Sequence, residues 1–445
     1  MKMSEVVEKA AAARRAALKL ANVTTGVKNS ALLKIASAIL ESKESILEAN
    51  AEDLRAAEKL LKRGRITSAL LQRLKLSEDK LKDIVKMIRS VAELDDPVGR
   101  TLYAVELDRG LELYKVSCPI GVIGAIFEAR PDVLPQISSL CLKSGNAVVL
   151  KGGSEARRSN EAFFRVIKGA SESAGIPTGW IQLIEARREV RELLRLDDFI
   201  DLLVPRGSRE FVRYIQENTR IPVLGHAEGL CHIYVDADAD IDKALKICYD
   251  AKVQYPAVCN AVETILVHSR IAERFLRPLG KLYSEAGVEI RGDERVRKIL
   301  PSAKRATERD WRTEYLDLII SIKVVDSIQE AIDHINTYGS KHTDAIITED
   351  RKSARLFLTA VDSSSVMLNA STRFSDGYRY GLGAEVGIST GKIHARGPVG
   401  LEGLTTSKYY LLGDGHVVAD YLGSKAKPFT HRPLRKKWLE AERKL

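Results

Sequence analysis

The sequence predicts an α/β protein in which two doubly wound units follow a helical N-terminal region. Short apolar segments alternate with helical segments from residue 119 onward, which is typical of parallel sheets with helices on both faces. A hairpin pattern separates this part from the helical region. The length of 445 residues provides for two or three domains at about 150 residues each.

The first 96 residues are predicted to be mainly helical, because strong helix formers carry apolar residues three and four positions apart. Residues 5–9 and the alanine-rich run after them begin this pattern, and residues 28–40 and 45–61 continue it. Ser77 is the expected N-cap of a further helix. Apolar and polar residues then alternate over 101–115, which predicts a β-hairpin.

Two α/β units are predicted after the hairpin, and no Ser/Gly-rich linker separates them. The first unit has apolar strands at 121–127, 147–150, 181–184 and 202–204, and helices at 133–144 and 159–174. The second unit has strands at 232–235, 264–267, 318–325 and 345–348, and helices at 241–251, 327–336 and 351–361.

Composition and charge exclude several classes of protein. The formal charge is +10, and residues 421–445 carry +6 of it, from eight Lys or Arg and two Glu. This basic tail lacks the interleaved aromatic residues of a single-strand binding groove, so we expect a solvated extension and no nucleic acid binding. Trp438 and Leu439 leave an alternative, a short helix over 435–444 that docks on the body of the protein. No apolar run approaches the ~18 residues of a membrane span. Five scattered cysteines form no disulfide framework, which favours a reducing, cytoplasmic setting.

Common cofactor and metal motifs are missing from the sequence. It contains no Gly-x-Gly-x-x-Gly fingerprint and no Walker A loop. Asp236, Asp238 and Asp240 alternate as in a calcium loop, but the Gly and Glu that such a loop requires are replaced. No metal site is therefore expected.

Cys259 is the candidate nucleophile. It stands between a predicted helix and the strand at 264–267, with Pro256 and Asn260 on either side, so we expect it on a turn. Nucleophiles favour such loops because a loop side chain can reach a cleft. The alternative is a small buried hydrophobe, the usual fate of a cysteine.

Several long segments accompany the Cys259 loop in the sequence. They include Gln254-Tyr-Pro-Ala-Val-Cys-Asn-Ala-Val-Glu263, Ile126-Phe-Glu-Ala-Arg-Pro-Asp132, Leu150-Lys-Gly-Gly-Ser-Glu-Ala156, Asn369-Ala-Ser-Thr-Arg-Phe-Ser-Asp-Gly-Tyr378 and His394-Ala-Arg-Gly-Pro-Val-Gly-Leu-Glu-Gly403. Through them the chain resembles the gamma-glutamyl phosphate reductases, or glutamate-5-semialdehyde dehydrogenases, of the aldehyde dehydrogenase superfamily. The likeness extends from about residue 5 to residue 420.

The resemblance implies an aldehyde-dehydrogenase-like fold with a small β oligomerisation arm. It places an NADP-binding domain at 1–229, interrupted by an arm hairpin at about 98–118, and a catalytic domain at 230–400. An arm strand at 401–420 and the basic tail at 421–445 follow. The arm implies a homodimer or a dimer-based oligomer.

The resemblance also implies a reaction. NADPH would reduce gamma-glutamyl phosphate to glutamate-5-semialdehyde and phosphate in proline biosynthesis, through a thioester on Cys259. Phosphate is a good leaving group, so the first step needs little acid assistance. A separate glutamate kinase is a candidate partner that the sequence neither supports nor excludes.

The cofactor contacts that the resemblance implies follow the strands of the first unit. Lys151 resembles the lysine that contacts the adenosine ribose and its 2′-phosphate. Gly207 and Ser208 open a helix whose N–H groups would face the pyrophosphate. Glu314 matches the carboxylate that holds the nicotinamide ribose. The cofactor-binding residues implied are Lys151, Ser154, Glu155, Gly207, Ser208 and Glu314.

Four residues are expected to bind the substrate. Arg130 matches the stretch that carries an oxyanion-binding Asn in other superfamily members, and it would suit an anionic acyl phosphate; the alternative is a structural ion pair. Asn369, Ser371 and Arg373 precede a glycine-dense segment that is expected to line the substrate pocket, where a carboxylate needs Arg or backbone donors.

Two other functions remain open at this point. An aldehyde-oxidising dehydrogenase would use Cys259 with Glu228 as the base that activates water, but the motif around Glu228 departs from the superfamily pattern, so we do not expect Glu228 to be catalytic. A nonenzymatic protein could bind RNA through the basic tail, but the complete loop around Cys259 argues against it.

Overall fold

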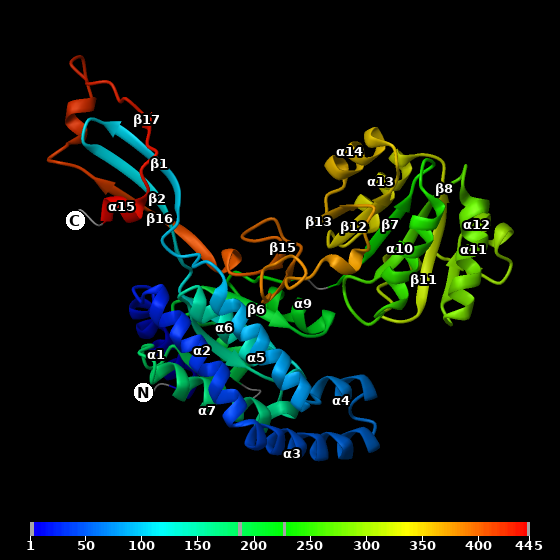
Figure 1. Cartoon of the computed structure of the whole chain (residues 1–445), viewed down its shortest axis with the longest axis horizontal. Helices are drawn as coiled ribbons and strands as arrows, with labels where there is room; N and C mark the ends of the chain where they lie inside the picture. The colour runs from blue at the N-terminus through cyan, green and yellow to red at the C-terminus, as the bar shows by residue number, and fades with distance from the viewer. Residues whose placement is uncertain (1–3, 186–188, 226–227, 443–445) are drawn as a thin grey trace.

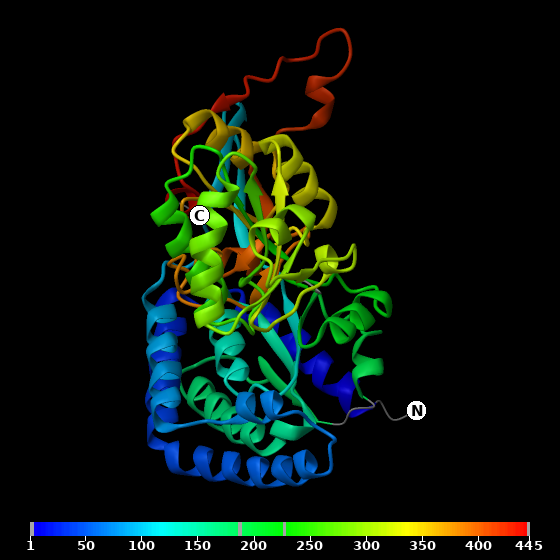
Figure 2. The ribbon, with the colours of Figure 1, turned by 90° about the vertical axis from the view of Figure 1, so that its right-hand side faces the viewer.

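The computed structural model describes residues 4–185, 189–225 and 228–442. Two α/β units and a narrow β arm make up the molecule, and the arm projects from the first unit away from the second (Figure 1). The view turned by 90° shows the arm at one end of the molecule and the N-terminal helices at the other (Figure 2).

A parallel sheet in the order β5-β4-β3-β6 forms the centre of the first unit. Side chains alternate between its faces: Ile123 and Phe127 enter one apolar core, whereas Val122 and Ile126 enter another. Helices cover both faces, so these strands are buried, as the sequence predicted, except at Gln182 and Arg206, which are half-buried. The strands are β3 (Val122–Phe127), β4 (Ala147–Lys151), β5 (Ile181–Ile184) and β6 (Leu202–Arg206).

The helices that were predicted in the first unit, α2, α3, α6 and α7 among them, begin and end within about three residues of the predicted positions, whereas no bounds were predicted for α4, α8 and α9. Ser77 caps α5, because its hydroxyl accepts a hydrogen bond from the Lys80 N–H at 3.2 Å. These helices are α1 (Glu5–Leu20), α2 (Thr25–Glu41), α3 (Lys43–Lys62), α4 (Ser68–Leu74), α5 (Glu78–Glu93), α6 (Val133–Lys143), α7 (Arg157–Glu172), α8 (Glu189–Leu193) and α9 (Arg209–Glu217).

The second unit contains a seven-stranded parallel sheet in the order β10-β9-β11-β8-β7-β12-β13. Its strands are β7 (Cys231–Val235), β8 (Val262–His268), β9 (Glu289–Gly292), β10 (Lys304–Arg305), β11 (Ile319–Val325), β12 (Thr343–Ile347) and β13 (Ser365–Leu368). Its helices are α10 (Ile241–Val253), α11 (Ala272–Glu285), α12 (Glu294–Ile299), α13 (Ile328–Tyr338) and α14 (Arg351–Ala360). The sequence analysis identified β7, β8, β11 and β12. The other three strands have four residues or fewer, too short to show a period.

The segment after β13 returns to the first unit. It contains the antiparallel pair β14 (Gly387–Ser389) and β15 (Gly397–Val399). The sequence analysis assigned this segment to the second domain. Its apolar side chains instead enter the core of the first unit, where burial stabilises them. They are Ala384, Val386, Val399, Leu401 and Leu404.

The arm is a four-stranded antiparallel sheet in the order β16-β2-β1-β17. The predicted hairpin forms β1 (Thr101–Asp108) and β2 (Leu111–Pro119), and β16 (Thr405–Leu412) pairs with β2 along its whole length. The basic tail joins this sheet: β17 (Arg432–Pro433) pairs with β1, and α15 (Trp438–Glu442) follows it. The tail is therefore part of the arm and not a separate extension.

Trp438 anchors the tail to the arm. Its ring stacks on Tyr410 at a centroid distance of 4.1 Å and contacts the edge of Tyr114 at 5.7 Å. Its backbone N–H donates to the Thr101 hydroxyl at 2.8 Å. The side chain is 7% exposed, whereas that of the next residue, Leu439, is 55% exposed.

We expect Trp438→Ala to lower the free energy of unfolding of the arm by ~3 kcal/mol, because it removes a large buried aromatic side chain. Leu439→Ala, at the exposed neighbouring position, should change it by less than ~0.5 kcal/mol. Thermal unfolding, together with limited proteolysis of the 424–442 segment, measures both. Equal protease resistance of the two variants would contradict this role for Trp438.

Candidate active site

Cys259 lies on the loop of residues 254–261, which joins α10 to β8 and is called the Cys259 loop below. Cys259 stands on a turn, as predicted, and it is half-buried. Because the loop precedes β8, it lies at the amino edge of the seven-stranded sheet. The Asn260 side-chain NH₂ donates to the Ser375 carbonyl at 2.8 Å, which ties the loop to the segment after β13.

Gly229 holds two further segments against the Cys259 loop. A Cβ atom at this position would lie 2.1 Å from the Cys259 carbonyl oxygen, so a side chain has no room. The Gly229 N–H donates to the Glu314 carboxylate at 2.9 Å, and the Cys231 thiol donates to the Cys259 carbonyl at 3.2 Å. The backbone next to Glu228, the Glu314 loop and the Cys259 loop therefore meet at one point.

The other predicted cofactor residues gather at the carboxyl edge of the first sheet. Phe127, the last residue of β3, pairs with Arg206, the last residue of β6. The chain leaves β3 for β4 on one side and returns to β6 on the other, so the strand order reverses between β3 and β6. Ligands of open α/β sheets bind outside the carboxyl ends of the strands at such a point. Lys151 ends β4 at this edge.

The contacts of the predicted cofactor residues suit an anionic ligand. The Ser208 hydroxyl caps α9, and the Ser208 N–H donates to the Glu128 carboxylate at 3.0 Å. A carboxylate thus binds the start of α9, where a phosphate would bind, so this helix end accepts anions. Lys151 is buried and donates to the Gly152 carbonyl. The Glu155 carboxylate instead accepts a hydrogen bond from the Ala129 backbone N–H at 2.7 Å.

Arg130 forms the ion pair that the sequence left as its alternative role. Its guanidinium lies 2.7 Å from the Asp132 carboxylate. Burial opposes ionisation of Asp132, but the charge of Arg130 and its hydrogen bond outweigh this and hold the pKa of Asp132 below its usual value. The Arg130 side chain remains 44% exposed, so the guanidinium also has donors that face solvent.

The segment 369–375 separates its predicted substrate residues. Arg373 is buried, and its Nε donates to the Gln254 side chain in the Cys259 loop at 3.0 Å. Ser371 caps the short 3₁₀ turn that contains Arg373, so its hydroxyl has a structural role. Asn369 lies elsewhere: its amide group binds the Thr348 backbone N–H and carbonyl, both at 3.0 Å, beyond the carboxyl ends of β12 and β13. It is therefore at the opposite edge of the sheet from Cys259.

A buried ion pair joins the two ends of the Cys259 loop. Lys252, near the end of α10, lies 2.8 Å from Glu263 at the start of β8, and both side chains are almost fully buried. The second Glu263 oxygen accepts from the Leu316 N–H at 3.2 Å, two residues after Glu314. Burial raises the pKa of Glu263 to about 7, although Lys252 opposes the shift.

Arg206, Glu128, Lys252 and Glu263 were missed from the sequence. Arg206 follows the same apolar strand at 202–204 whose position led to Gly207 and Ser208, and this position was the signal that could have identified it. Lys252 and Glu263 carried no such signal, because a charged residue within a helix or strand usually faces solvent. Their pairing depends on the contact between α10 and β8.

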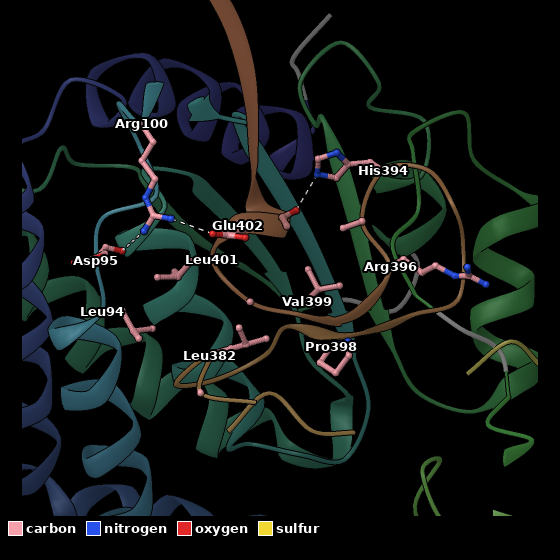
Figure 3. Close-up of a pocket in the computed structure, with 14 residues that line it drawn as sticks. Leu94, Asp95, Arg100, Leu382, His394, Arg396, Pro398, Val399, Leu401 and Glu402 are labelled. Atoms are coloured by element: carbon pink, nitrogen blue, oxygen red, sulfur yellow. Dashed lines mark hydrogen bonds and ion pairs between the residues drawn. The ribbon is translucent and has the colours of Figure 1, made fainter. Parts of the chain in front are cut away.

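A cavity of about 520 Å³ lies at the base of the arm (Figure 3). Arg100 and Glu402 form an ion pair at 3.0 Å on its wall, and apolar side chains such as Leu94 and Leu401 line the rest. None of its lining residues belongs to the Cys259 loop or to the edge of β3 and β6. This cavity is therefore separate from the candidate active site.

Among the described residues, no three His, Cys, Asp or Glu side chains are grouped so as to hold a metal ion. In the same part of the chain, every helix is too short or too polar to cross a membrane.

Comparison with known proteins gives consistent matches. The model of the aldehyde dehydrogenase family matches residues 1–298. The gamma-glutamyl phosphate reductase of Methanosarcina barkeri is 58% identical over 97% of this chain and 98% of its own. The crystal structure of the Thermotoga maritima gamma-glutamyl phosphate reductase matches with a TM-score of 0.89 and 44% identity, over 93% of this chain and 100% of that chain. A glyceraldehyde-3-phosphate dehydrogenase of Methanocaldococcus jannaschii, complexed with NADP, shares the fold at 19% identity and a TM-score of 0.65, over 92% and 94% of the two chains.

We expect the buried ion pair to make unfolding depend on pH. The folded chain binds the Glu263 proton more tightly than the unfolded chain, since the pKa is about 7 against an ordinary 4.5. The stabilisation from this group is complete below about pH 4.5 and is lost as the pH rises through about 7. Between about pH 5 and pH 8, the free energy of unfolding of the wild type should fall by up to ~3 kcal/mol relative to a Lys252→Met, Glu263→Gln double variant.

Urea unfolding at several pH values measures this difference. Glu273→Gln is the matched control, because Glu273 forms an exposed ion pair with Arg277 on α11 and should leave the pH profile unchanged. Parallel pH profiles for the wild type and the double variant would show that Glu263 titrates normally in the folded chain.

Proposed function

Because the chain belongs to the aldehyde dehydrogenase family, and within it to the gamma-glutamyl phosphate reductases, we propose that it reduces gamma-glutamyl phosphate to glutamate-5-semialdehyde and phosphate, in proline biosynthesis. We propose further that NADPH is the reductant and that Cys259 forms a thioester. One observation supports this most strongly: the Cys259 loop, Gly229 and Glu314 converge at the amino edge of the second sheet.

Cys259 would act as the nucleophile in the first step. Its sulfur forms a bond to the acyl carbon, the bond from that carbon to the phosphate oxygen breaks, and phosphate leaves with the bonding electrons. The thiolate is the reactive form, and nearby cations favour it. Arg373 brings a cation to the same loop, because its Nε donates to the Gln254 side chain at 3.0 Å.

The residues proposed to contact the cofactor are Lys151, Ser154, Gly207, Ser208 and Glu314. Glu155 would contribute indirectly, by holding the backbone of the loop after β3 at Ala129. Lys151 would hold the adenosine end at the carboxyl edge of the first sheet, and the start of α9 would hold the phosphates once Glu128 gives way. Glu314 would hold the nicotinamide ribose while its bond to Gly229 keeps it beside Cys259. When bound, the nicotinamide supplies the hydride that reduces the thioester and releases the thiolate.

The substrate residues proposed are Arg130 and Arg373. Arg373 comes from the segment that returns to the Cys259 loop, and Arg130 comes from the loop after β3, so the two cations belong to different units. The bond of Ser371 supports the turn that carries Arg373. Asn369 would not contact the substrate. It would hold the start of the segment that carries Arg373 against the Thr348 backbone.

The reverse reaction tests the proposal. Pyrroline-carboxylate equilibrates with the semialdehyde, so the chain should reduce NADP in its presence only when phosphate is added, and NAD should be the poorer acceptor. NADP reduction without phosphate would instead indicate an aldehyde-oxidising dehydrogenase. Absence of reduction under both conditions would contradict the proposed function.

We expect Cys259→Ser to lower the rate of this reaction about a thousandfold, a loss of at least ~4 kcal/mol of transition-state stabilisation. Cys118→Ser is the control, because Cys118 is also half-buried but lies on β2 of the arm. Both variants should unfold at the wild-type temperature. Near-wild-type turnover by pure Cys259→Ser enzyme would exclude the thioester.

We also propose a homodimer or a dimer-based oligomer in which the arm lies on a neighbouring copy. Strand β16 is an open edge of the arm sheet, and Tyr409 and Leu411 on it are 62% and 56% exposed. Apolar residues on an open edge favour pairing with another chain. A separate glutamate kinase stays a candidate partner, because the reactive acyl phosphate must be supplied by a phosphoryl transfer.

We expect sedimentation at micromolar concentration to show a dimer or larger assembly. Leu411→Glu should shift the distribution toward the monomer, since it places a charge on the open edge without disturbing a buried site. Leu358→Glu on α14, where the side chain is 42% exposed, is the control and should assemble normally. A wild-type monomer at this concentration would contradict the assembly.

A further inference from the structure

Arg206 ends β6 at the point where the strand order of the first sheet reverses. Its backbone carbonyl accepts from the Glu128 N–H at 3.0 Å, which joins the ends of β6 and β3. Its side chain lies against β14, because a Cβ atom at Gly387 would be 3.1 Å from the Arg206 Nη1 atom. Arg206 therefore lies between the cofactor edge and the segment that returns from the second unit.

The Arg206 guanidinium lacks a carboxylate partner within the described part of the chain. No carboxylate oxygen of those residues lies within 4 Å of it, and its side chain makes no hydrogen bond to them. By contrast, Arg130 is paired with Asp132 at 2.7 Å, and Arg373 is bonded to Gln254. A half-buried guanidinium with all of its donors available is suited to bind an anion.

Other charges around Arg206 identify where that anion would lie. Burial and the neighbouring charge of Arg130 lower the pKa of Arg206, while Glu385 and Cys259 oppose the shift. Two like charges held close together are stabilised by an anion that contacts both. Geometry connects Arg206 to the Cys259 loop through one segment: its side chain lies against Gly387 of β14, and the same segment binds the loop where the Ser375 carbonyl accepts from the Asn260 side chain at 2.8 Å.

We propose that Arg206, together with Arg130, binds the phosphate group of the acyl phosphate beside Cys259 and retains it as it leaves. This inference rests on the proposed function. The C–O bond to phosphate breaks as the Cys259 sulfur bonds to the acyl carbon, so negative charge accumulates on the departing oxygen. Two guanidinium groups stabilise that charge, and water supplies the proton that converts the product to hydrogen phosphate.

The phosphates of the dinucleotide are the competing ligand for Arg206. The start of α9 already offers them the Ser208 N–H, which now binds Glu128. The side chain of Arg206 contacts β14 instead, and β14 belongs to the segment that continues from Arg373. These contacts favour the substrate phosphate over the cofactor, and the two assignments predict different kinetic effects.

The reverse reaction separates them, because phosphate and NADP are varied independently. We expect Arg206→Gln to raise the KM for inorganic phosphate about tenfold or more, and to leave the KM for NADP within about twofold. Arg206→Lys should have an intermediate effect, since an ammonium keeps the charge but lacks the planar pair of donors. Arg213→Gln is the control, because Arg213 is exposed on the same α9 helix and should match the wild type.

A second measurement does not depend on turnover. Inorganic phosphate should slow alkylation of Cys259 by iodoacetamide in the wild type, and this protection should be lost in Arg206→Gln. An unchanged phosphate KM with intact protection would overturn the assignment, and so would a rise in the KM for NADP alone. If the wild type itself shows no phosphate-dependent NADP reduction, the proposed function fails, and not only the role of Arg206.

Discussion

The close contact between Gly229 and the Cys259 carbonyl is the constraint on which the rest of the site depends. The backbone at 229 can approach so closely only because it carries no side chain. This approach lets the Gly229 N–H reach Glu314 and brings Cys231 under the Cys259 carbonyl. Any side chain at 229 would push the three segments apart, and Cys259 would lose its position relative to Glu314.

The candidate site is formed by two sheet edges, the carboxyl edge of the first sheet and the amino edge of the second. The first unit contributes the carboxyl ends of β3, β4 and β6, where cations and a helix start can receive anions. The second unit contributes the amino edge with the Cys259 loop. A buried ion pair lies at the base of the Cys259 loop. It costs desolvation but joins α10, β8 and the backbone two residues after Glu314. Arg130 and Arg206 lie at the first of these edges, and Arg373 is bonded to the Cys259 loop at the second.

Much of the fold could be predicted because its causes are local. A fully buried strand such as β3 is a continuous apolar run, and a cap such as Ser77 acts within its own turn. The missed strands β9 and β10 carry no such run, because charged residues occupy half or more of their positions. The position of the tail depends on contacts between residues that are distant in the sequence. Trp438 stacks on Tyr410 of β16, and residues 421–445 alone do not identify that partner.

For the site, the sequence by itself determined the nucleophile candidate, the turn that carries it and the family that its motifs resemble. The tertiary structure alone decided which side chains act together. In the folded chain the Asn369 amide binds the Thr348 backbone, and Arg130 pairs with Asp132. Arg206 has no carboxylate partner among the described residues. The physical reason is range: periodicity and capping act over a few residues, whereas a hydrogen bond or ion pair depends on atoms that only the packing of distant elements brings within about 3 Å.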